Sequence, residues 1–272
     1  MSAISNSLAI WRLANAGVGF RSRLLSFLCA RFGNLSESRR KLRNILFHWI
    51  GWFAWNGQIK IFFRVSGQPL VILLRKGNRA DYLVFGEMVM GGYKIPEDSS
   101  RPTAVIDGGA NIGLFSLFVH ATFPGIKMTC YEPDQDNLEQ LRKNLEANNI
   151  VAEVVPKALW SRTAELFFHP GESYSGFVNA DQSPFPISCV LPKVPTGCWL
   201  KLDIEGAEYE VLPAIMEDGG GGPVVISMEI HDFNRRGESL LGLLRRHGYT
   251  IGGSFGPDDI CVTVCACKPL HA

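Results

Sequence analysis

The stretch Ala104–Gly113, A-V-I-D-G-G-A-N-I-G, combines a short apolar run, an acidic residue and three glycines. A pattern of apolar residues typical of a helix follows it, from Ile112 to Phe123. This order predicts a strand, a tight turn and a helix. Glycines let the backbone bend sharply and approach a ligand, because no Cβ stands in the way. Open α/β sheets bind small molecules at such turns, so we expect a ligand here.

Strand and helix patterns alternate beyond Pro102, which predicts a mostly parallel, seven-stranded sheet with helices on both faces. The expected strands are Thr103–Asp107, Lys127–Tyr131, Ala152–Val155, Cys198–Asp203, Pro223–Glu229, Tyr249–Ser254 and Ile260–Ala266. The expected helices are Ile112–Phe123, Asp136–Asn149, Glu208–Met216 and Glu238–His247. The last two strands follow one another without a helix, which favours an antiparallel edge. The alternation of strands and helices is interrupted at residues 160–197, where one strand is expected at Ala164–Phe168.

The N-terminal part has a different pattern. Residues 1–56 look helical, and the strand-like runs Gln58–Arg64 and Pro69–Arg75 flank a turn signal typical of a hairpin. A short helix is expected at Asp81–Met90. We therefore predict a helical and hairpin cap over residues 1–100 and a ligand-binding domain over residues 101–272.

Charge is uneven along the chain. Residues 1–43 hold eight Lys and Arg against one Glu, whereas the whole chain has a net charge of +1. No nucleic-acid motif accompanies this basic segment, so no nucleic-acid partner is expected. The run Ile45–Trp55 is too short to span a bilayer. We favour a buried cap helix there, and weak contact with a membrane surface through this basic, Trp-rich region is the open alternative.

The seven cysteines show no zinc-type pairing, and their odd number argues against a disulfide framework. Cys130, Cys261 and Cys265 lie in apolar runs, where we expect buried, reduced thiols. The N-terminus lacks the features of a signal peptide. A cytoplasmic location is the expectation.

Asp107 restricts the ligand of the glycine turn. A carboxylate at this position repels a pyrophosphate, and the turn lacks the G-x-G-x-x-G spacing of dinucleotide sites. S-adenosylmethionine suits the site better, because it has an ammonium, a sulfonium and a ribose but no phosphate. Glu132 directly follows the second strand, where a carboxylate can accept both ribose hydroxyl protons.

A second motif, W-L-K-L-D-I-E-G-A-E at residues 199–208, places four charges around the end of an apolar strand. Lys201 and Asp203 share one strand face and are expected to pair. Glu208 is interpreted as an acid that favours the N-terminus of the next helix.

These motifs carry a resemblance to known enzymes. D-G-G-A-N-I-G resembles the D-x-G-x-x-x-G motif of class I S-adenosylmethionine-dependent methyltransferases, and K-L-D-I-E-G-A-E resembles the K-x-D-x-E-G-x-E signature of the FkbM family. Y-E-P-D, P-K-A-L-W and V-V-I-S-M-E-I-H follow that family's order. The resemblance covers about residues 79–231. The resemblance departs at residues 180–198, a segment that is short and proline-rich here, so the family does not predict which residues line the substrate side of the site.

The resemblance implies a Rossmann-like class I methyltransferase fold with S-adenosylmethionine as cofactor and O-methylation of a hydroxyl on a small molecule, sugar or glycan. The residues expected to bind the cofactor are Asp107, Gly108, Gly109, Asn111, Gly113, Glu132, Pro133 and Ala158. Adenine is expected near 157–159, and residues 173–177 are read either as a lid or as a surface hairpin.

Three residues are expected to carry the chemistry. His231 ends the fifth strand, where its ordinary pKa suits removal of a hydroxyl proton. Asp203 or Glu205 is expected to assist it, and Glu229, on the same strand face, is expected to orient the imidazole. No metal is expected, although a divalent ion held by Asp203, Glu205 and His231 is an open alternative.

Other classes of function stay open from the sequence. A methyltransferase fold can serve as a non-catalytic cofactor-binding or scaffold protein. The acceptor can be a nitrogen atom or a nucleic acid instead of a hydroxyl. A nicotinamide oxidoreductase is disfavoured by Asp107.

Overall fold

The computed structural model describes residues 16–33, 56–93, 100–169, 176–217, 222–253, 255–256 and 258–268, together with positions 45, 48, 50 and 52. The chain divides into two compact units. One consists of Met1–Tyr93, Ile112–Gly125 and Glu139–Val151, and the other of Lys94–Asn111, Ile126–Leu138 and Ala152–Ala272. The predicted division at residue 100 stays a prediction. Most of the apolar run at 45–55 and the lid residues 173–175 lie outside the described residues.

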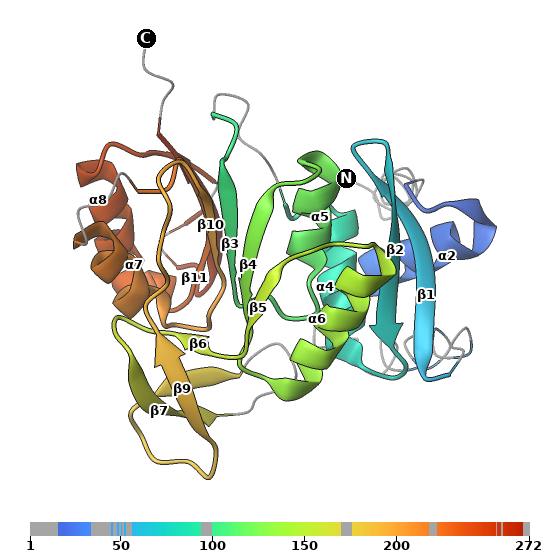
Figure 1. Ribbon diagram of the computed structural model, residues 1–272, viewed down its shortest axis with the longest axis horizontal. Coiled ribbons are helices and arrows are strands. Elements are labelled where there is room, and N and C mark those ends of the chain that lie inside the picture. The colour runs from blue at the N-terminus through green and yellow to red at the C-terminus, as the bar shows by residue number, and fades with distance from the viewer. Residues whose placement is uncertain are drawn as a thin grey trace. The chain divides into compact units, whose positions relative to one another are not determined.

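The second unit contains a seven-stranded sheet with the order β12-β13-β11-β10-β3-β4-β5, of which Figure 1 labels β11, β10, β3, β4 and β5. The strands of this sheet are β3 (Ala104–Gly108), β4 (Lys127–Tyr131), β5 (Glu153–Val155), β10 (Trp199–Leu202), β11 (Val225–Ile230), β12 (Thr250–Gly252) and β13 (Val262–Cys267). Strands β11, β10, β3, β4 and β5 run parallel, and β13 pairs antiparallel with both β11 and β12. The predicted mostly parallel sheet with an antiparallel edge is confirmed.

The core of this unit lies between the sheet and the C-terminal helices α7 (Glu208–Glu217) and α8 (Glu238–Arg246). A short π-helix, η3 (Phe233–Gly237), joins β11 to α8. All four residues of β10 are buried, as expected for a central strand of a parallel sheet. The apolar side chains of β10, β11 and β13 pack with Val211, Leu212, Leu241 and Leu244 of the two helices.

A second sheet of four strands, with the order β6-β9-β7-β8, occupies the region where the alternation breaks. It consists of β6 (Ala158–Leu159), β7 (Ala164–His169), β8 (Phe177–Asn179) and β9 (Pro186–Val190). Only β7 was expected from the sequence. The other three strands contain two to five residues, so they are too short to show a clear periodicity.

The described part of the first unit contains the predicted hairpin and four helices. Its elements are α2 (Gly19–Gly33), β1 (Gln58–Val65), β2 (Gln68–Arg75), α4 (Arg79–Val89), α5 (Leu114–Thr122) and α6 (Gln135–Ala147), which begins in the second unit. Ser66 and Gly67 both have positive φ, 48° and 80°, between paired Val65 and Gln68. Such a two-residue turn matches the twist of the strands it joins, which explains the tight hairpin.

Side-chain amides of α6 form a ladder along the backbone of β2. Asn144 Oδ1 accepts a hydrogen bond from Leu73 N (2.8 Å), and its Nδ2 donates to Leu73 O (3.1 Å). Asn148 does the same with the N–H and carbonyl of Val71, both at 2.7 Å. Gln140 Nε2 also donates to Leu73 O, at 2.7 Å. Each asparagine thus pairs with β2 through one acceptor and one donor, as a neighbouring strand would.

Among the described residues, no helix is long and apolar enough to cross a membrane.

Candidate functional site

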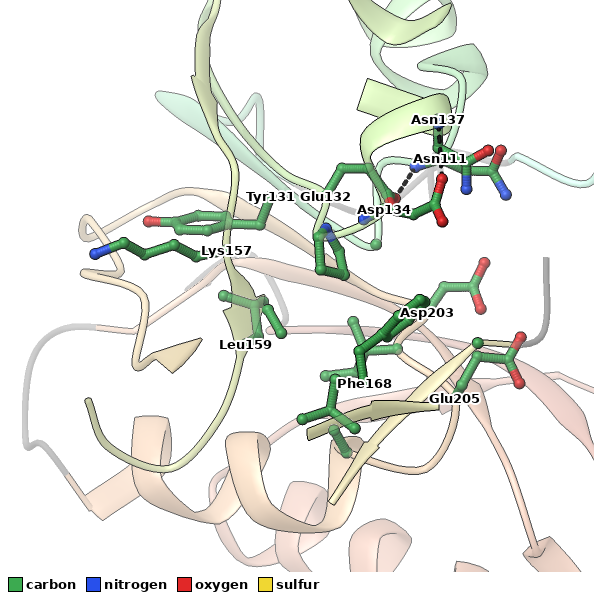
Figure 2. A pocket seen from close by; sticks show the side chains of 17 residues that line it. Asn111, Tyr131, Glu132, Asp134, Asn137, Lys157, Leu159, Phe168, Asp203 and Glu205 are labelled. Carbon is green, nitrogen blue, oxygen red and sulfur yellow. Dashed lines mark hydrogen bonds between the residues drawn. The ribbon is translucent and has the colours of Figure 1, made fainter. Parts of the chain in front are cut away.

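A pocket opens at the carboxyl ends of β3, β4 and β10, and every residue that lines it belongs to the second unit (Figure 2). Figure 2 shows Tyr131, Lys157 and Leu159 on one side of this pocket, and Asp203 and Glu205 on another. The lining residues are Gly109, Asn111, Tyr131, Glu132, Pro133, Asp134, Asn137, Lys157, Ala158, Leu159, Phe168, Gly176, Val178, Asp203, Ile204, Glu205 and Ala207. The pocket lies where parallel α/β sheets bind their ligands.

Lys201 organises the charges below the pocket. The parallel register places it beside Asp107 of β3, and its Nζ lies 3.4 Å from Asp107 Oδ1 and 3.6 Å from Asp203 Oδ2. Nζ also donates to the carbonyl of Gly109 at 2.6 Å. Burial lowers the pKa of Lys201, but the carboxylates of Asp203 and Asp107 outweigh this effect and raise the pKa. Lys201 is therefore a buried cation that ties the glycine turn to the end of β10, and its predicted pairing with Asp203 is confirmed.

Glu132 is the buried carboxylate of the pocket, with 5% of its surface exposed. Its Oε2 accepts the backbone N–H of Asn111 (2.7 Å), and its Oε1 accepts that of Asp134 (2.9 Å). Burial raises the pKa of Glu132 to about 7, and the two backbone hydrogen bonds oppose this shift. Each carboxylate oxygen has further lone pairs, so both can accept hydroxyl protons from a ligand.

The glycine turn is shaped by close backbone approach. Gly109 has φ 72°, and a Cβ added there would collide with the carbonyl oxygen of Asp203. Gly113 has φ 87°, and its Cβ would meet the side chain of Leu141. Both positions therefore require glycine for two reasons, the left-handed conformation and the lack of space.

His231 lies between two carboxylates just beyond the end of β11. Its Nε2 is 3.2 Å from Glu205 Oε2, and its Nδ1 is 3.1 Å from Oε1 of the fully buried Glu208. Burial lowers the pKa of His231, but hydrogen bonds with Cys261, Glu205 and Glu208 outweigh this effect and raise it. These contacts therefore favour the protonated form of the imidazole.

Glu205 occupies a strained turn directly after β10. Its φ is 53°, which a residue with a side chain seldom adopts, and Gly206 follows with φ 99°. Conformations of this kind cluster at functional sites, where the surrounding structure holds them in place. The turn brings the carboxylate of Glu205 to both the pocket and His231.

Two expectations near His231 need correction. The carboxylate that contacts His231 Nδ1 is that of Glu208, which the sequence suggested was only an acid at a helix N-terminus. Glu229, which was expected to orient the imidazole, instead accepts a hydrogen bond at Oε1 from Cys261 Sγ at 2.9 Å. The helix α7 carries Glu208 toward the end of β11, a contact that strand alternation alone does not indicate. Cys130 is buried as expected, but Cys261 is exposed, because it lies just outside β13.

The structure brings most of the predicted site residues together. Seven line the pocket: Gly109, Asn111, Glu132, Pro133, Ala158, Asp203 and Glu205. Asp107 and Gly108 are buried at the end of β3, His231 contacts Glu205, and Gly113 is the N-cap of α5.

Sequence reasoning did not find several lining residues. Asp134 directly precedes α6, and its Oδ1 accepts the N–H of Asn137 in the first turn at 2.9 Å. An Asp just before a helix is a recognisable capping signal. Phe168 and Val178 come from the small sheet, and no signal in the sequence pointed to them.

Fold and pocket together define a class of protein: a Rossmann-like α/β protein with a pocket at the carboxyl ends of its strands. The pocket fits S-adenosylmethionine in its chemistry. A buried carboxylate, Glu132, is available for ribose hydroxyls, the apolar side chains of Leu159 and Phe168 suit an adenine, and Asp203 offers a negative charge to a cationic group.

The chain belongs to the FkbM family of S-adenosylmethionine-dependent methyltransferases. The family model described as Methyltransferase FkbM domain matches residues 107–251, more than half of the chain. The matched segment contains the glycine turn, Glu132, the Lys201–Glu208 motif and His231. The predicted family and the Rossmann-like class are thereby confirmed.

Two curated relatives are similar to this chain. The 31-O-demethyl-FK506 methyltransferase FkbM of Streptomyces tacrolimicus is 25% identical over 193 residues, which are 56% of this chain and 74% of the relative. Methyltransferase sdnD of Sordaria araneosa is 29% identical over 171 residues, which are 46% of this chain and 65% of the relative.

Solved structures of methyltransferases are also similar, at low identity. The 16S rRNA N2 G1207 methyltransferase (RsmC) of T. Thermophilus, in complex with AdoMet and guanosine, shares 13% identity with a TM-score of 0.40, over 78% of this chain and 50% of that one. The N-terminal domain of human METTL16, in complex with SAH, shares 17% identity with a TM-score of 0.34, over 71% and 70%. Likeness at this level does not bear on the acceptor.

Proposed function

We propose that this protein transfers the methyl group of S-adenosylmethionine to a hydroxyl of a small molecule, sugar or glycan. The observation that carries the proposal is the charge of the pocket. Besides the buried Glu132, three half-buried carboxylates line it, those of Asp134, Asp203 and Glu205, against Lys157 as the one cationic side chain of the lining. A ligand with a sulfonium and an ammonium gains from this lining, whereas the pyrophosphate of a nicotinamide dinucleotide is repelled.

The positions of the side chains support the following cofactor roles. Glu132 accepts the ribose hydroxyls, and the apolar wall of Ala158, Leu159 and Phe168 holds the adenine. Gly109 lets the backbone approach the methionine end, where Asp203 faces its positive charge. Asp107 acts through Lys201, which it holds in place.

The bound cofactor supplies an electrophilic methyl group on a sulfonium, so much of the rate comes from alignment of the acceptor oxygen. An aliphatic hydroxyl also needs a proton acceptor. The sequence suggested His231, but both of its ring nitrogens face carboxylates and it does not line the pocket, whereas Glu205 does. We therefore assign the proton to the carboxylate of Glu205, which His231 holds by the 3.2 Å contact. Asp203 is the second carboxylate at the same end of the pocket.

The choice of oxygen as acceptor atom has two further supports. The printed name of the relative from Streptomyces tacrolimicus, 31-O-demethyl-FK506 methyltransferase, describes methylation at an oxygen of its own substrate. The strained turn at Glu205 also agrees with a carboxylate that is held ready for a hydroxyl proton.

Calorimetric titration with S-adenosylmethionine tests the cofactor part. We expect Asp203→Asn to weaken binding about 10- to 100-fold, since it removes a hydrogen-bonding charge. Asp136→Asn is the matched control, because Asp136 is exposed on α6 and does not line the pocket. If the unaltered protein binds no cofactor at any attainable concentration, the proposal fails.

Incubation with methyl-labelled cofactor and fractionated cell extract tests the reaction, and mass analysis locates the methyl group in the product. We expect an O-methylated small molecule or glycan. A product methylated at nitrogen, or on RNA, would refute the acceptor assignment. Cofactor binding without formation of S-adenosylhomocysteine in any fraction would favour a scaffold role.

A further inference from the structure

Strand pairing brings a histidine, a cysteine and a glutamate to one face of the sheet. In the antiparallel pair of β11 and β13, Glu229 lies opposite Thr263, and Ile230 lies opposite Val262. One step further, the same register places His231 opposite Cys261. Directly opposed residues project to the same face, and Glu229 shares that face because it lies two residues before His231.

The side chains converge as this register requires. One ligand atom from each of Glu229, His231 and Cys261 lies within 4.8 Å of the other two. Cys261 Sγ donates to Glu229 Oε1 at 2.9 Å, so thiol and carboxylate already face each other. Ligand atoms about 2.0–2.3 Å from a tetrahedral zinc ion are separated by roughly 3.3–3.8 Å. The three atoms therefore reach ligand spacing through small side-chain movements.

Glu208 supplies a second and independent sign of a metal site. This carboxylate is fully buried and is held by the N–H of Ile204, which donates to its Oε1 at 3.0 Å. The same oxygen lies 3.1 Å from His231 Nδ1. Histidines that bind metals usually donate their other ring N–H to such a carboxylate, which fixes the tautomer and orients the ring. His231 Nε2 is then the nitrogen that is directed away from Glu208.

We propose that Glu229, His231 and Cys261 bind a divalent transition metal of the zinc class, with Glu208 as the residue that orients His231. The ion takes the place of the protons on Cys261 Sγ and His231 Nε2, which are released to solvent. Sulfur, nitrogen and carboxylate oxygen form a ligand set that favours zinc over magnesium or calcium. Cys261 is exposed, so the ion can enter from solvent. A water molecule would complete the tetrahedral coordination, and Glu205, 3.2 Å from His231 Nε2, stays outside the ligand set.

Zinc binding at this position would connect the metal to the cofactor pocket, because Glu205 lines that pocket and also contacts His231. The proposal itself does not depend on methyl transfer. Metal binding is measured by titration without methyl transfer. The metal site can therefore be refuted while the proposed function stands, and the reverse also holds.

Cobalt(II) is the probe for this site, because it replaces zinc and reports its ligands by absorption. We expect titration of the metal-free protein to produce a thiolate-to-cobalt charge-transfer band and the intense visible bands of four-coordinate cobalt, saturating at one equivalent. Zinc should then abolish both. Absence of the charge-transfer band from the unaltered protein would overturn the proposal.

Variants identify the ligands. Cys261→Ser should abolish the charge-transfer band, whereas the matched control Cys267→Ser, which changes another thiol of the same edge, should retain it. Glu229→Gln keeps the thiol and should weaken cobalt affinity with the band preserved at saturation. Glu208→Gln should weaken affinity about 10- to 100-fold. A band that survives Cys261→Ser in a protein with unchanged circular dichroism would place the metal elsewhere and refute the assignment.

Discussion

Replacement of Glu132 by glutamine tests whether this buried carboxyl makes the stability of the fold depend on pH. Burial raises the pKa of this carboxyl from an ordinary 4.5 to about 7, so the folded protein binds a proton here that the unfolded chain releases between these two values. Stability from this group is therefore fully present below pH 4.5 and is lost as the pH rises through 7. Between pH 5 and pH 8 the loss amounts to about 2.5 kcal/mol.

Glu132→Gln removes this pH dependence. Glutamine also loses one of the two acceptor oxygens that now serve Asn111 and Asp134, which costs about 1–3 kcal/mol at every pH. The difference in unfolding free energy between variant and unaltered protein, measured by urea denaturation, should therefore shift by about 2–3 kcal/mol in favour of the variant from pH 5 to pH 8. A difference that stays constant over this range would refute the reasoning. Cofactor binding by the variant should weaken at both pH values.

Three further outcomes are expected. Gly109→Ala should destabilise the fold by at least about 2 kcal/mol more than Gly125→Ala in thermal unfolding, because both glycines have positive φ but only Gly109 faces a backbone oxygen at close range. Lys201→Met should lower the free energy of unfolding by about 3–5 kcal/mol, since it leaves Asp107 buried without its cation, and adding Asp107→Asn should restore part of the loss in the same urea assay. Glu205→Gln should reduce the rate of methyl transfer about 10²- to 10⁴-fold, while calorimetry shows a much smaller loss of cofactor affinity; an unchanged rate would remove Glu205 as the proton acceptor.

Much of the second unit could be predicted because its signals are local. The apolar run ending in Asp107 and the alternation in W-L-K-L-D specify two buried parallel strands, and parallel pairing then places Lys201 beside Asp107. Glu132 was found because a carboxylate at the end of the second strand has a known geometric role. These residues owe their positions to strand ends, which periodicity locates well.

The unpredicted features depend on contacts between distant segments. Phe168 reaches the pocket through a sheet whose other strands have two to five residues, too few for a period to be visible. The contact between Glu208 and His231 requires the start of α7 to lie against the end of β11, a position set by helix packing. Cys261 lies in an apolar run but one residue outside β13, where the chain reaches solvent.

The amide ladder of α6 has a consequence for association between molecules. An open strand edge presents free N–H and C=O groups to any extended chain that approaches it, and such edges promote aggregation. On β2, Asn144 and Asn148 occupy the hydrogen-bonding groups of Leu73 and Val71 with their own donors and acceptors. A helix thus takes the place of a third strand. As long as α6 is folded against β2, this edge of the hairpin cannot pair with a strand of another molecule and so cannot start a fibril.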